Sequence, residues 1–584
     1  MKKLLGIFRL PELYCALLLA ASLVIGFALR VSVENVVLRQ GASMEKVSLP
    51  VTKKMRDGEV FQVELDIKNV YRTPYDLRVV PDDCAEGIVI NGQNLEIRSE
   101  PGRCNFTKGF LLDDSVTAPH RVGDRTHYTF YLKNNGGNAG LNVFIYQTSF
   151  LTRVANVGAV VFFALLCMFV ARRFKLRGGI LFLFLLGVLL RTVFFANVPY
   201  TTYSNDVDGH VAYVQYVLDN HAIPGVDDCW TCYHPPVYYV TAAPAFVLGN
   251  WMGVSGTTGL QAFSLLLSVL TLFLGILFLK NFMSGGALGI ASLLWTMWPV
   301  LILMSPRIGN DQMFCLMHVL CLWGGVKYFN EGRGKFLIVA VLAAALAVWT
   351  KTTGVVTIGM VFLFAVGGYF RSARLLHPTK SEVVAWVFFA LLLAGIALQK
   401  LLGDADLVGN SSGLNGRLRV GNEAFNYIFF DLKSFVTHPY TSAWNEEWGR
   451  EFFWNYAFKS SMFGEFELVR NETGRTLATL MSVSFLGLMV YAARGFWKTK
   501  LQVMHWILLL QAAAFFGALM VLRIKVPFSC SNDFRYIAPV VLSIVPFMAT
   551  GVTLEGSSVK WKVLGYVLVA TFALSTVILY ILAM

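Results

Sequence analysis

Residues 258–280 read TGLQAFSLLLSVLTLFLGILFLK, and no charged side chain occurs in this stretch before Lys280. A helix needs roughly 20 mostly apolar residues to cross the hydrocarbon core of a bilayer. The stretch therefore predicts a membrane-spanning helix. By the same criterion the chain predicts about thirteen spans, near residues 11–30, 154–171, 178–198, 258–280, 287–304, 310–329, 336–350, 354–370, 383–402, 477–494, 503–522, 536–553 and 563–583.

The composition supports this prediction. The chain has 584 residues, of which 56% are hydrophobic and 15% are charged, and its mean hydropathy is +0.58. Soluble domains carry about 25% charged residues, so a soluble, disordered or coiled-coil protein is excluded. Lys2 and Lys3 precede an apolar run too long for a signal peptide, which favours an uncleaved anchor at 1–30.

The net charge of +13 would suggest a nucleic-acid partner in a soluble protein. Here the Lys and Arg residues concentrate in alternate short loops, for example Arg172, Arg173, Lys175 and Arg177 between the second and third spans. Loops retained in the cytoplasm collect such residues. We therefore predict an integral protein of a bacterial inner or plasma membrane, with a cytoplasmic N-terminus, the lipid bilayer as its surroundings and no nucleic-acid partner.

Residues 31–152, after the first span, are predicted to form an exoplasmic β-sandwich with a jelly-roll-like pattern. Short β-patterned runs recur there and are separated by turn signals such as Asn91-Gly92. The runs are 31–38, 47–51, 60–67, 88–90, 127–132 and 141–147. Residues 81–92 resemble a stretch of carbohydrate-binding modules, and a lid domain without a ligand is the alternative.

The predicted organisation continues in three parts. Residues 153–402 form a transmembrane core with an exoplasmic catalytic loop at 199–257. Residues 403–476 form a second exoplasmic loop, whose aromatic segment from Phe452 to Phe466 predicts a helix at headgroup level. Residues 477–584 form the C-terminal spans.

Five of the nine cysteines lie on the predicted exoplasmic side; four of them form two groups, and Cys530 is left unpaired. Cys84 and Cys104 share the β-domain and predict a disulfide in an oxidising compartment. Cys229 and Cys232 form a lone CxxC, for which a disulfide is the first expectation. A zinc site completed by His221 and His234 is the alternative; no cofactor is otherwise indicated, and a divalent metal stays open.

Ionisable side chains cluster in the predicted catalytic loop. Asp206 and Asp208 stand two residues apart, followed by His210 and later by His234 and Tyr238. A helix N-cap would explain one aspartate. The whole cluster at a water–lipid boundary favours a functional site.

This pattern resembles the polytopic C-type (GT-C) glycosyltransferases, in which an acidic pair in the first large exoplasmic loop is followed by His-Pro-Pro and aromatic residues. The resemblance is greatest to the protein O-mannosyltransferase and aminoarabinose transferase branch. Further segments match in order, at 305–311, 349–351 and 534–539. One departure is that Val207 separates the two acids, which the family often has as adjacent Asp-Glu.

The resemblance implies a GT-C-like helical fold and an inverting transfer of sugar from a polyprenyl-phosphate donor to a glycan, lipid or protein acceptor. Asp208, or alternatively Asp206, is expected to be the general base. The donor phosphate is expected to bind Arg307, Lys351 and Arg535. Lys and Arg concentrate in the predicted cytoplasmic loops, so those on the exoplasmic side need a reason. Snorkelling of these side chains at span ends is the alternative. Residues expected to shape the site are His210, His234, Tyr238, Asp311 and Tyr536.

Two other functions stay open. An oligosaccharide transferase or ligase of the same superfamily would move a whole glycan. A lipid or solute transporter should show an internal repeat and helices broken near the midplane, and the chain shows no convincing repeat. No Gly-rich phosphate loop is present that would indicate nucleotide chemistry.

Overall fold

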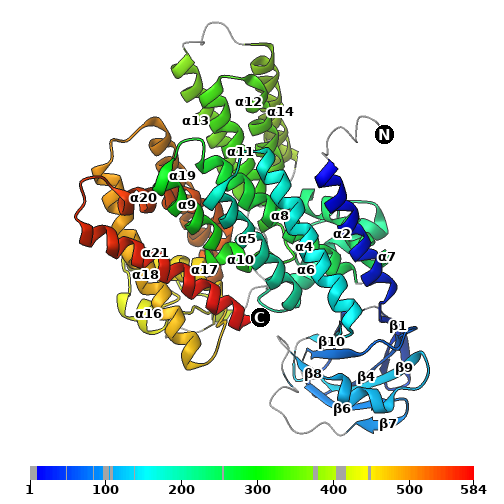
Figure 1. Cartoon of the computed structure of the whole chain (residues 1–584). Coiled ribbons are helices and arrows are strands. Elements are labelled where there is room, and N and C mark those ends of the chain that lie inside the picture. Colours follow the sequence, from blue (N-terminus) through cyan, green and yellow to red (C-terminus); the bar gives the residue numbers. More distant parts are fainter. Residues whose placement is uncertain are drawn as a thin grey trace. The chain divides into compact units, whose positions relative to one another are not determined.

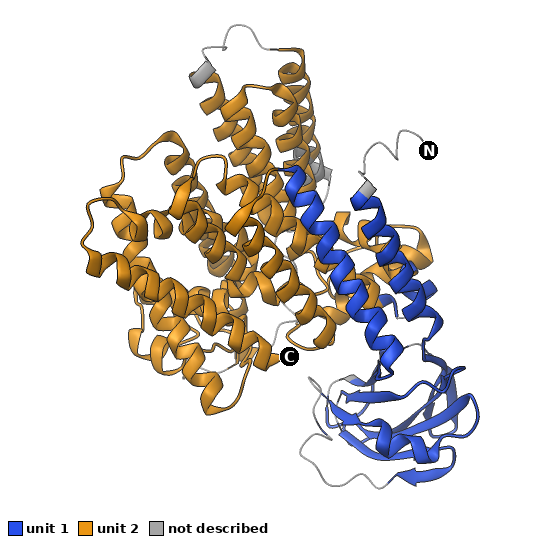
Figure 2. Ribbon diagram, viewed as in Figure 1, with its two compact units in different colours: residues 1–174, 248–256 blue, residues 175–247, 257–584 orange. Residues whose placement is uncertain are grey.

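The computed structural model describes residues 10–47, 49–82, 84–95, 104, 109–136, 138–204, 206–252, 255–372, 379–402, 416–444 and 449–584. The chain divides into two compact units (Figures 1 and 2). Unit 1 comprises residues 1–174 and 248–256, and unit 2 comprises residues 175–247 and 257–584. Of the predicted loop at 403–476, residues 403–415 and 445–448 lie outside the described part.

Unit 1 contains two long apolar helices and all ten strands of the described chain (Figure 1). Helix α2 (Leu10–Ala28) packs against α4 (Phe150–Arg173). Both are long and apolar enough to cross a bilayer. The strands lie between them in sequence.

The strands form two antiparallel sheets, in the orders β2-β1-β4-β9-β6-β7 and β3-β10-β5-β8. Alternation explains the packing: in β4, residues Phe61, Val63, Leu65 and Ile67 are buried and the residues between them are not. Side chains of both sheets join one hydrophobic core, which makes the domain a β-sandwich, as predicted. The strands are β1 (Ser32–Gln40), β2 (Ser43–Lys46), β3 (Val51–Lys54), β4 (Val60–Lys68), β5 (Tyr75–Pro81), β6 (Cys84–Ile90), β7 (Gln93–Leu95), β8 (Phe110–Leu112), β9 (Arg125–Lys133) and β10 (Asn138–Gln147).

Unit 2 is helical. Its α-helices are α5 (Gly178–Asn197), α6 (Val207–Asn220), α7 (Val237–Met252, ending in unit 1), α8 (Gly256–Leu279), α9 (Gly285–Met297), α10 (Pro299–Leu303), α11 (Asp311–Glu331), α12 (Gly334–Val348), α13 (Val355–Ser372), α14 (Lys380–Leu402), α15 (Ala424–Ile428), α16 (Leu432–Thr437), α17 (Phe453–Phe463), α18 (Glu472–Lys498), α19 (Val503–Lys525), α20 (Val541–Thr553) and α21 (Val559–Ala583). Short 3₁₀ helices are η1 (Ala118–His120) in unit 1 and η2 (Thr352–Gly354), η4 (Gly416–Leu418), η6 (Ser529–Asn532) and η7 (Phe534–Val540) in unit 2.

Within the described residues, 9 helices are long and apolar enough to span a membrane, and α9 and α12 are shorter apolar helices. The chain is therefore an integral membrane protein with an additional β-domain, which confirms the predicted fold class at this level. Two predicted spans are interrupted. The 287–304 stretch breaks at Pro299 into α9 and α10, and the 536–553 stretch begins in η7, which contains Pro539.

The predicted interfacial helix corresponds to α17, which other segments of unit 2 largely cover. Helix α17 exists, but an interfacial helix would leave one face open, and no residue of α17 is exposed. Polar side chains such as Asn455, Lys459 and Ser460 are fully buried on it. The aromatic residues that suggested a headgroup position instead pack inside unit 2, for example Phe458 against Phe485 at 5.2 Å between ring centroids.

Four short segments of unit 2 adjoin the ends of apolar helices. They follow α5, precede α11, follow α12 and follow α19. If consecutive apolar helices cross the membrane in opposite directions, all four segments face the same side. These segments carry the residues of the candidate site.

Candidate active site

Arg535 is the centre of the site. It lies in η7, and its side chain is only 7% exposed. Its Nε atom is 3.0 Å from Oδ2 of Asp533 and 3.9 Å from Oδ2 of Asp311, and its Nη2 atom is 3.9 Å from Oδ2 of Asp206. One buried cation thus faces three carboxylates from different segments, as a buried charge requires.

Lys351 adds a second cation. Its ammonium forms an ion pair with Asp311 and lies 4.2 Å from the ring centroid of Tyr536, whose hydroxyl accepts a hydrogen bond of 3.1 Å from Nη2 of Arg535. Burial lowers the pKa of Lys351, and the negative charge of Asp311 opposes this shift. The structure therefore brings together four residues predicted separately: Asp311, Lys351, Arg535 and Tyr536.

The break between α12 and η2 places Lys351 here. Helix α12 ends at Val348, and the backbone of Lys351 is extended, with φ −156° and ψ 143°. Asn310 donates a hydrogen bond of 3.0 Å to the carbonyl of Thr350. This bond ties the Lys351 segment to the start of α11, so that Asp311 and Lys351 are adjacent.

Asp206 precedes α6 but does not cap it. Its backbone is left-handed, with φ 59° and ψ 15°, and its side chain makes no capping hydrogen bond. The carboxylate instead accepts a hydrogen bond of 3.0 Å from Nε1 of Trp230 and faces Arg535. The Asp206 carboxylate thus faces the cation instead of the first turn of α6.

Asp208 lies in the first turn of α6, and the structure does not bring it to Arg535. Its side chain makes no hydrogen bond or ion pair among the described residues. It is exposed at the surface, yet partial burial of its carboxyl raises the pKa. The two aspartates therefore have different surroundings.

Aromatic side chains support the acidic loop. Nδ1 of His210 is 2.8 Å from the hydroxyl of Tyr239, and the His210 ring stacks on His234 at 5.8 Å. Burial lowers the pKa of His210 to about 4 and that of His234 well below its usual value, so burial favours the neutral form of both rings. The hydroxyl of Tyr238 accepts a hydrogen bond of 3.1 Å from the backbone N–H of Gly309, which holds the turn before Asp311.

Arg307 is the third predicted cation. Its guanidinium lies 5.8 Å from the ring centroid of Phe466 and makes no ion pair or side-chain hydrogen bond among the described residues. Burial lowers its pKa, as does the charge of Arg535, whereas Asp533, Asp311 and Glu465 raise it. Arg307 is therefore close enough to the cluster to interact with it electrostatically.

Sequence reasoning missed the roles of Trp230 and Glu465. Tyr456 donates a hydrogen bond to Oε1 of Glu465, and burial raises the pKa of this carboxyl to about 7. Glu465 stands in an aromatic segment without a recognisable motif. Trp230 had a usable signal, because it lies between Cys229 and Cys232.

The predicted cysteine pairs are bonded in the structure: Cys84 to Cys104 and Cys229 to Cys232. The second bond leaves no thiolate for the alternative zinc site. Among the described residues, no group of three His, Cys, Asp or Glu side chains could hold a metal ion. Asp311 and Asp533 pair with Lys351 and Arg535 instead.

Comparisons with known proteins give distant similarity. No protein-family model and no curated protein matches the chain. The apo oligosaccharyltransferase of Archaeoglobus fulgidus matches at TM-score 0.41 and 13% identity, over 69% of this chain and 55% of that one. AglB of the same organism, in complex with an inhibitory peptide and a dolichol-phosphate, matches at TM-score 0.36, 13% identity and the same coverage of 69% and 55%.

The arabinosyltransferase EmbB of Mycobacterium smegmatis matches at TM-score 0.30 and 11% identity, over 94% of this chain and 64% of that one. The chain thus spans little more than half the length of the archaeal enzymes. At these TM-scores the similarities do not establish a shared fold.

Proposed function

We propose that the chain is a GT-C-type glycosyltransferase that moves a sugar from a polyprenyl-phosphate donor to an acceptor on the exoplasmic side of a bacterial inner membrane. The observation that carries this proposal is the contact between Asp206 and Arg535 at the ends of apolar helices. A carboxylate beside a fixed cation provides a base and an anion-binding group in one place. The topology that the basic loops predict, with a cytoplasmic N-terminus, would put this place on the exoplasmic side.

The donor phosphate would bind the cations. Lys351 and Arg535 already pair with Asp311 and Asp533, whereas Arg307 has no such partner among the described residues. Arg307 is therefore the first candidate for direct phosphate contact, with the other two adding positive potential. Fixed positive charge stabilises the charge that develops on a leaving phosphate.

Asp206 is the better candidate for the general base. Its side chain is 43% exposed, so that an acceptor can reach it, while Trp230 fixes its orientation. Asp208 was the first expectation from the sequence. Its raised pKa would suit a base, but it lacks contact with the cations that would hold the donor.

The reaction would be a single displacement. The acceptor oxygen or nitrogen forms a bond to the anomeric carbon, its proton passes to the Asp206 carboxylate, and the bond from carbon to phosphate oxygen breaks. The electron pair of that bond stays on the phosphate, and the anomeric configuration inverts. A positioned general base contributes about 10²–10⁴-fold.

The test is sugar transfer by the full chain in liposomes, with a panel of polyprenyl-phosphate sugars. We expect Asp206→Asn to lower the rate by about 10²–10⁴-fold and Asp208→Asn, the matched control, to keep most of it. Full activity of Asp206→Asn would refute the assignment of the base. If the wild type consumes none of the donors, the enzymatic proposal itself fails.

A further inference from the structure

One end of the β-sandwich lies where the span α2 ends and the span α4 begins. Helix α2 ends at Ala28 and β1 starts at Ser32, while β10 ends at Gln147 and α4 starts at Phe150. The carbonyl of Leu29 accepts hydrogen bonds from Nε2 of Gln147 at 2.7 Å and from Oγ1 of Thr73 at 3.5 Å. This end of the domain is therefore held against the end of a span.

Two turns form this end: residues 69–74 between β4 and β5, and residues 121–124 before β9. The backbone N–H of Asn69 donates a hydrogen bond of 2.7 Å to the carbonyl of Asp124, so the turns are neighbours. The Asn69 side chain closes its own turn through Thr73, with bonds of 2.7 and 2.8 Å. The first turn is thus rigid.

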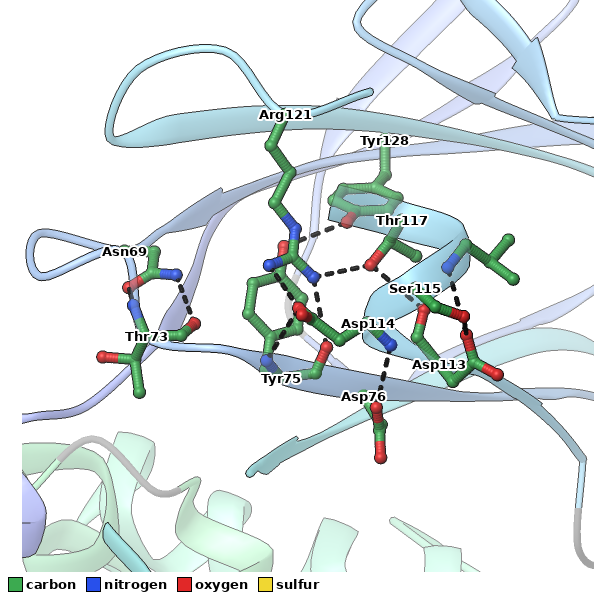
Figure 3. A network of polar contacts seen from close by, with 11 residues as sticks. Asn69, Thr73, Tyr75, Asp76, Asp113, Asp114, Ser115, Thr117, Arg121 and Tyr128 are labelled. Atoms are coloured by element: carbon green, nitrogen blue, oxygen red, sulfur yellow. Dashed lines mark hydrogen bonds and ion pairs between the residues drawn. The ribbon is translucent and has the colours of Figure 1, made fainter. Parts of the chain in front are cut away.

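Arg121 fixes the base of the second turn (Figure 3). Its guanidinium lies 2.7 Å from Asp114 and 3.7 Å from the ring centroid of Tyr75, and it donates to the carbonyl of Tyr75 at 3.1 Å and to Thr117 at 2.5 Å. Both turns therefore present fixed tips.

The tips carry apolar side chains that no described residue covers. Val70 is 56% exposed, Tyr71 is 64% exposed and Val122 is 71% exposed, and Arg72 is exposed beside them. Met44 lies in β2, where it pairs with Arg39 near the opposite end of β1. It is similarly exposed at 61% and lies away from the spans, because β1 runs from Ser32 to Gln40.

A tryptophan near these turns indicates their position relative to the lipid headgroup layer. Trp251 is 76% exposed and its ring stacks on Phe27 of α2 at 6.4 Å. Arg30 donates a hydrogen bond of 3.1 Å to the carbonyl of Met252. An exposed Trp and a half-buried Arg at the end of a span are typical of the headgroup layer, and Leu29, the anchor of the turns, is adjacent to Arg30.

We propose that turns 69–74 and 121–124 insert Val70, Tyr71 and Val122 into the outer headgroup layer of the bilayer, with Arg72 placed to meet lipid phosphate. The apolar tips extend the apolar surface of α2 and α4. The partner is the lipid surface, and the contact fixes the orientation of the β-domain on the membrane. It does not depend on whether the protein transfers sugar.

The test uses the full chain in nanodiscs of phosphatidylethanolamine and phosphatidylglycerol. Single cysteines replace Tyr71, Val122 or, as the matched control, Met44, and each is labelled with an environment-sensitive fluorophore. The unsubstituted protein gives the background from native cysteines. We expect nitroxide lipids to quench labels at 71 and 122 severalfold more than the label at 44, and aqueous iodide to show the reverse order.

Equal quenching at all three positions would overturn the proposal. So would protection of positions 71 and 122 by added oligosaccharide together with no quenching by lipid, because the two turns would then belong to a saccharide site. Hydrogen exchange of residues 69–74 on the unlabelled protein provides a second measurement. Exchange should be slower in nanodiscs than in detergent, and unchanged exchange counts against the insertion.

Discussion

Asp311 and Lys351 offer a test of how the site is held together. Their side chains are 16% and 8% exposed, and Asp311 also faces Arg535 at 3.9 Å. At an effective dielectric constant of about 20, two unit charges at that distance attract by about 4 kcal/mol. Asp311→Asn removes the counter-charge of two buried cations, whereas Lys351→Met leaves Asp311 with Arg535.

We therefore expect Asp311→Asn to lower the free energy of unfolding by about 3–5 kcal/mol and Lys351→Met by a smaller amount, about 1.5–3 kcal/mol. The double variant should cost less than the sum of the two, because the pair is coupled. Lys327→Met is the matched control: its partner Glu331 lies on the same helix α11, and the two side chains are 29% and 28% exposed. Such i,i+4 pairs contribute about 0.3–0.5 kcal/mol.

The assay is equilibrium unfolding of the purified chain in mixed micelles, followed by circular dichroism. If Asp311→Asn unfolds like Lys327→Met, the pair does not stabilise the site. If Lys351→Met costs more than Asp311→Asn, the assignment of Asp311 as the shared counter-charge is refuted.

Three further predictions concern packing, protonation and orientation. Gly275→Ala would place its Cβ against the indole of Trp295 and should lower the free energy of unfolding by about 1–3 kcal/mol, whereas Gly289→Ala, whose Cβ meets nothing within 4 Å, should be neutral or stabilise by up to ~1 kcal/mol. Burial raises the pKa of Glu465 to about 7, above its unfolded value; the folded state therefore binds more protons between these values, and stability falls as pH rises toward 7. Glu465→Gln should remove that part of the slope when unfolding is measured at about pH 5 and about pH 7.5, and an unchanged slope would contradict the shift. Trp230→Phe keeps the ring but removes the hydrogen bond to the proposed base; transfer should fall roughly 10-fold without a change in unfolding, and an unaffected rate would show that this bond does not orient the carboxylate.

The spans could be predicted because the signal is local: a membrane helix is recognised by its own length and composition. The interruptions at Pro299 and Pro539 were not predicted, although proline is the local signal for them. The sandwich was predicted from alternating strands such as β4, but β5 was missed, although Tyr75, Leu77 and Val79 alternate with less buried residues. The predicted strand at 47–51 contributes only Val51, which starts β3.

The position of α17 could not be predicted, because an aromatic-rich helix has the same composition at a membrane surface and in an interior. Burial depends on what other segments cover it. The same reason applies to the site. Asp206, Lys351 and Arg535 were singled out one by one, but their contacts depend on packing between helices distant in sequence, and Glu465 shows no local signal at all.

The distribution of the charged cluster along the chain has a consequence for biosynthesis. Asp206, Asp311 and Lys351 leave the ribosome long before Arg535. A nascent chain at that stage holds Asp206 and Asp311 without the arginine that later faces both. The cluster is complete only after the helices on either side of Arg535 have inserted, so an incompletely synthesised chain cannot assemble the proposed site prematurely.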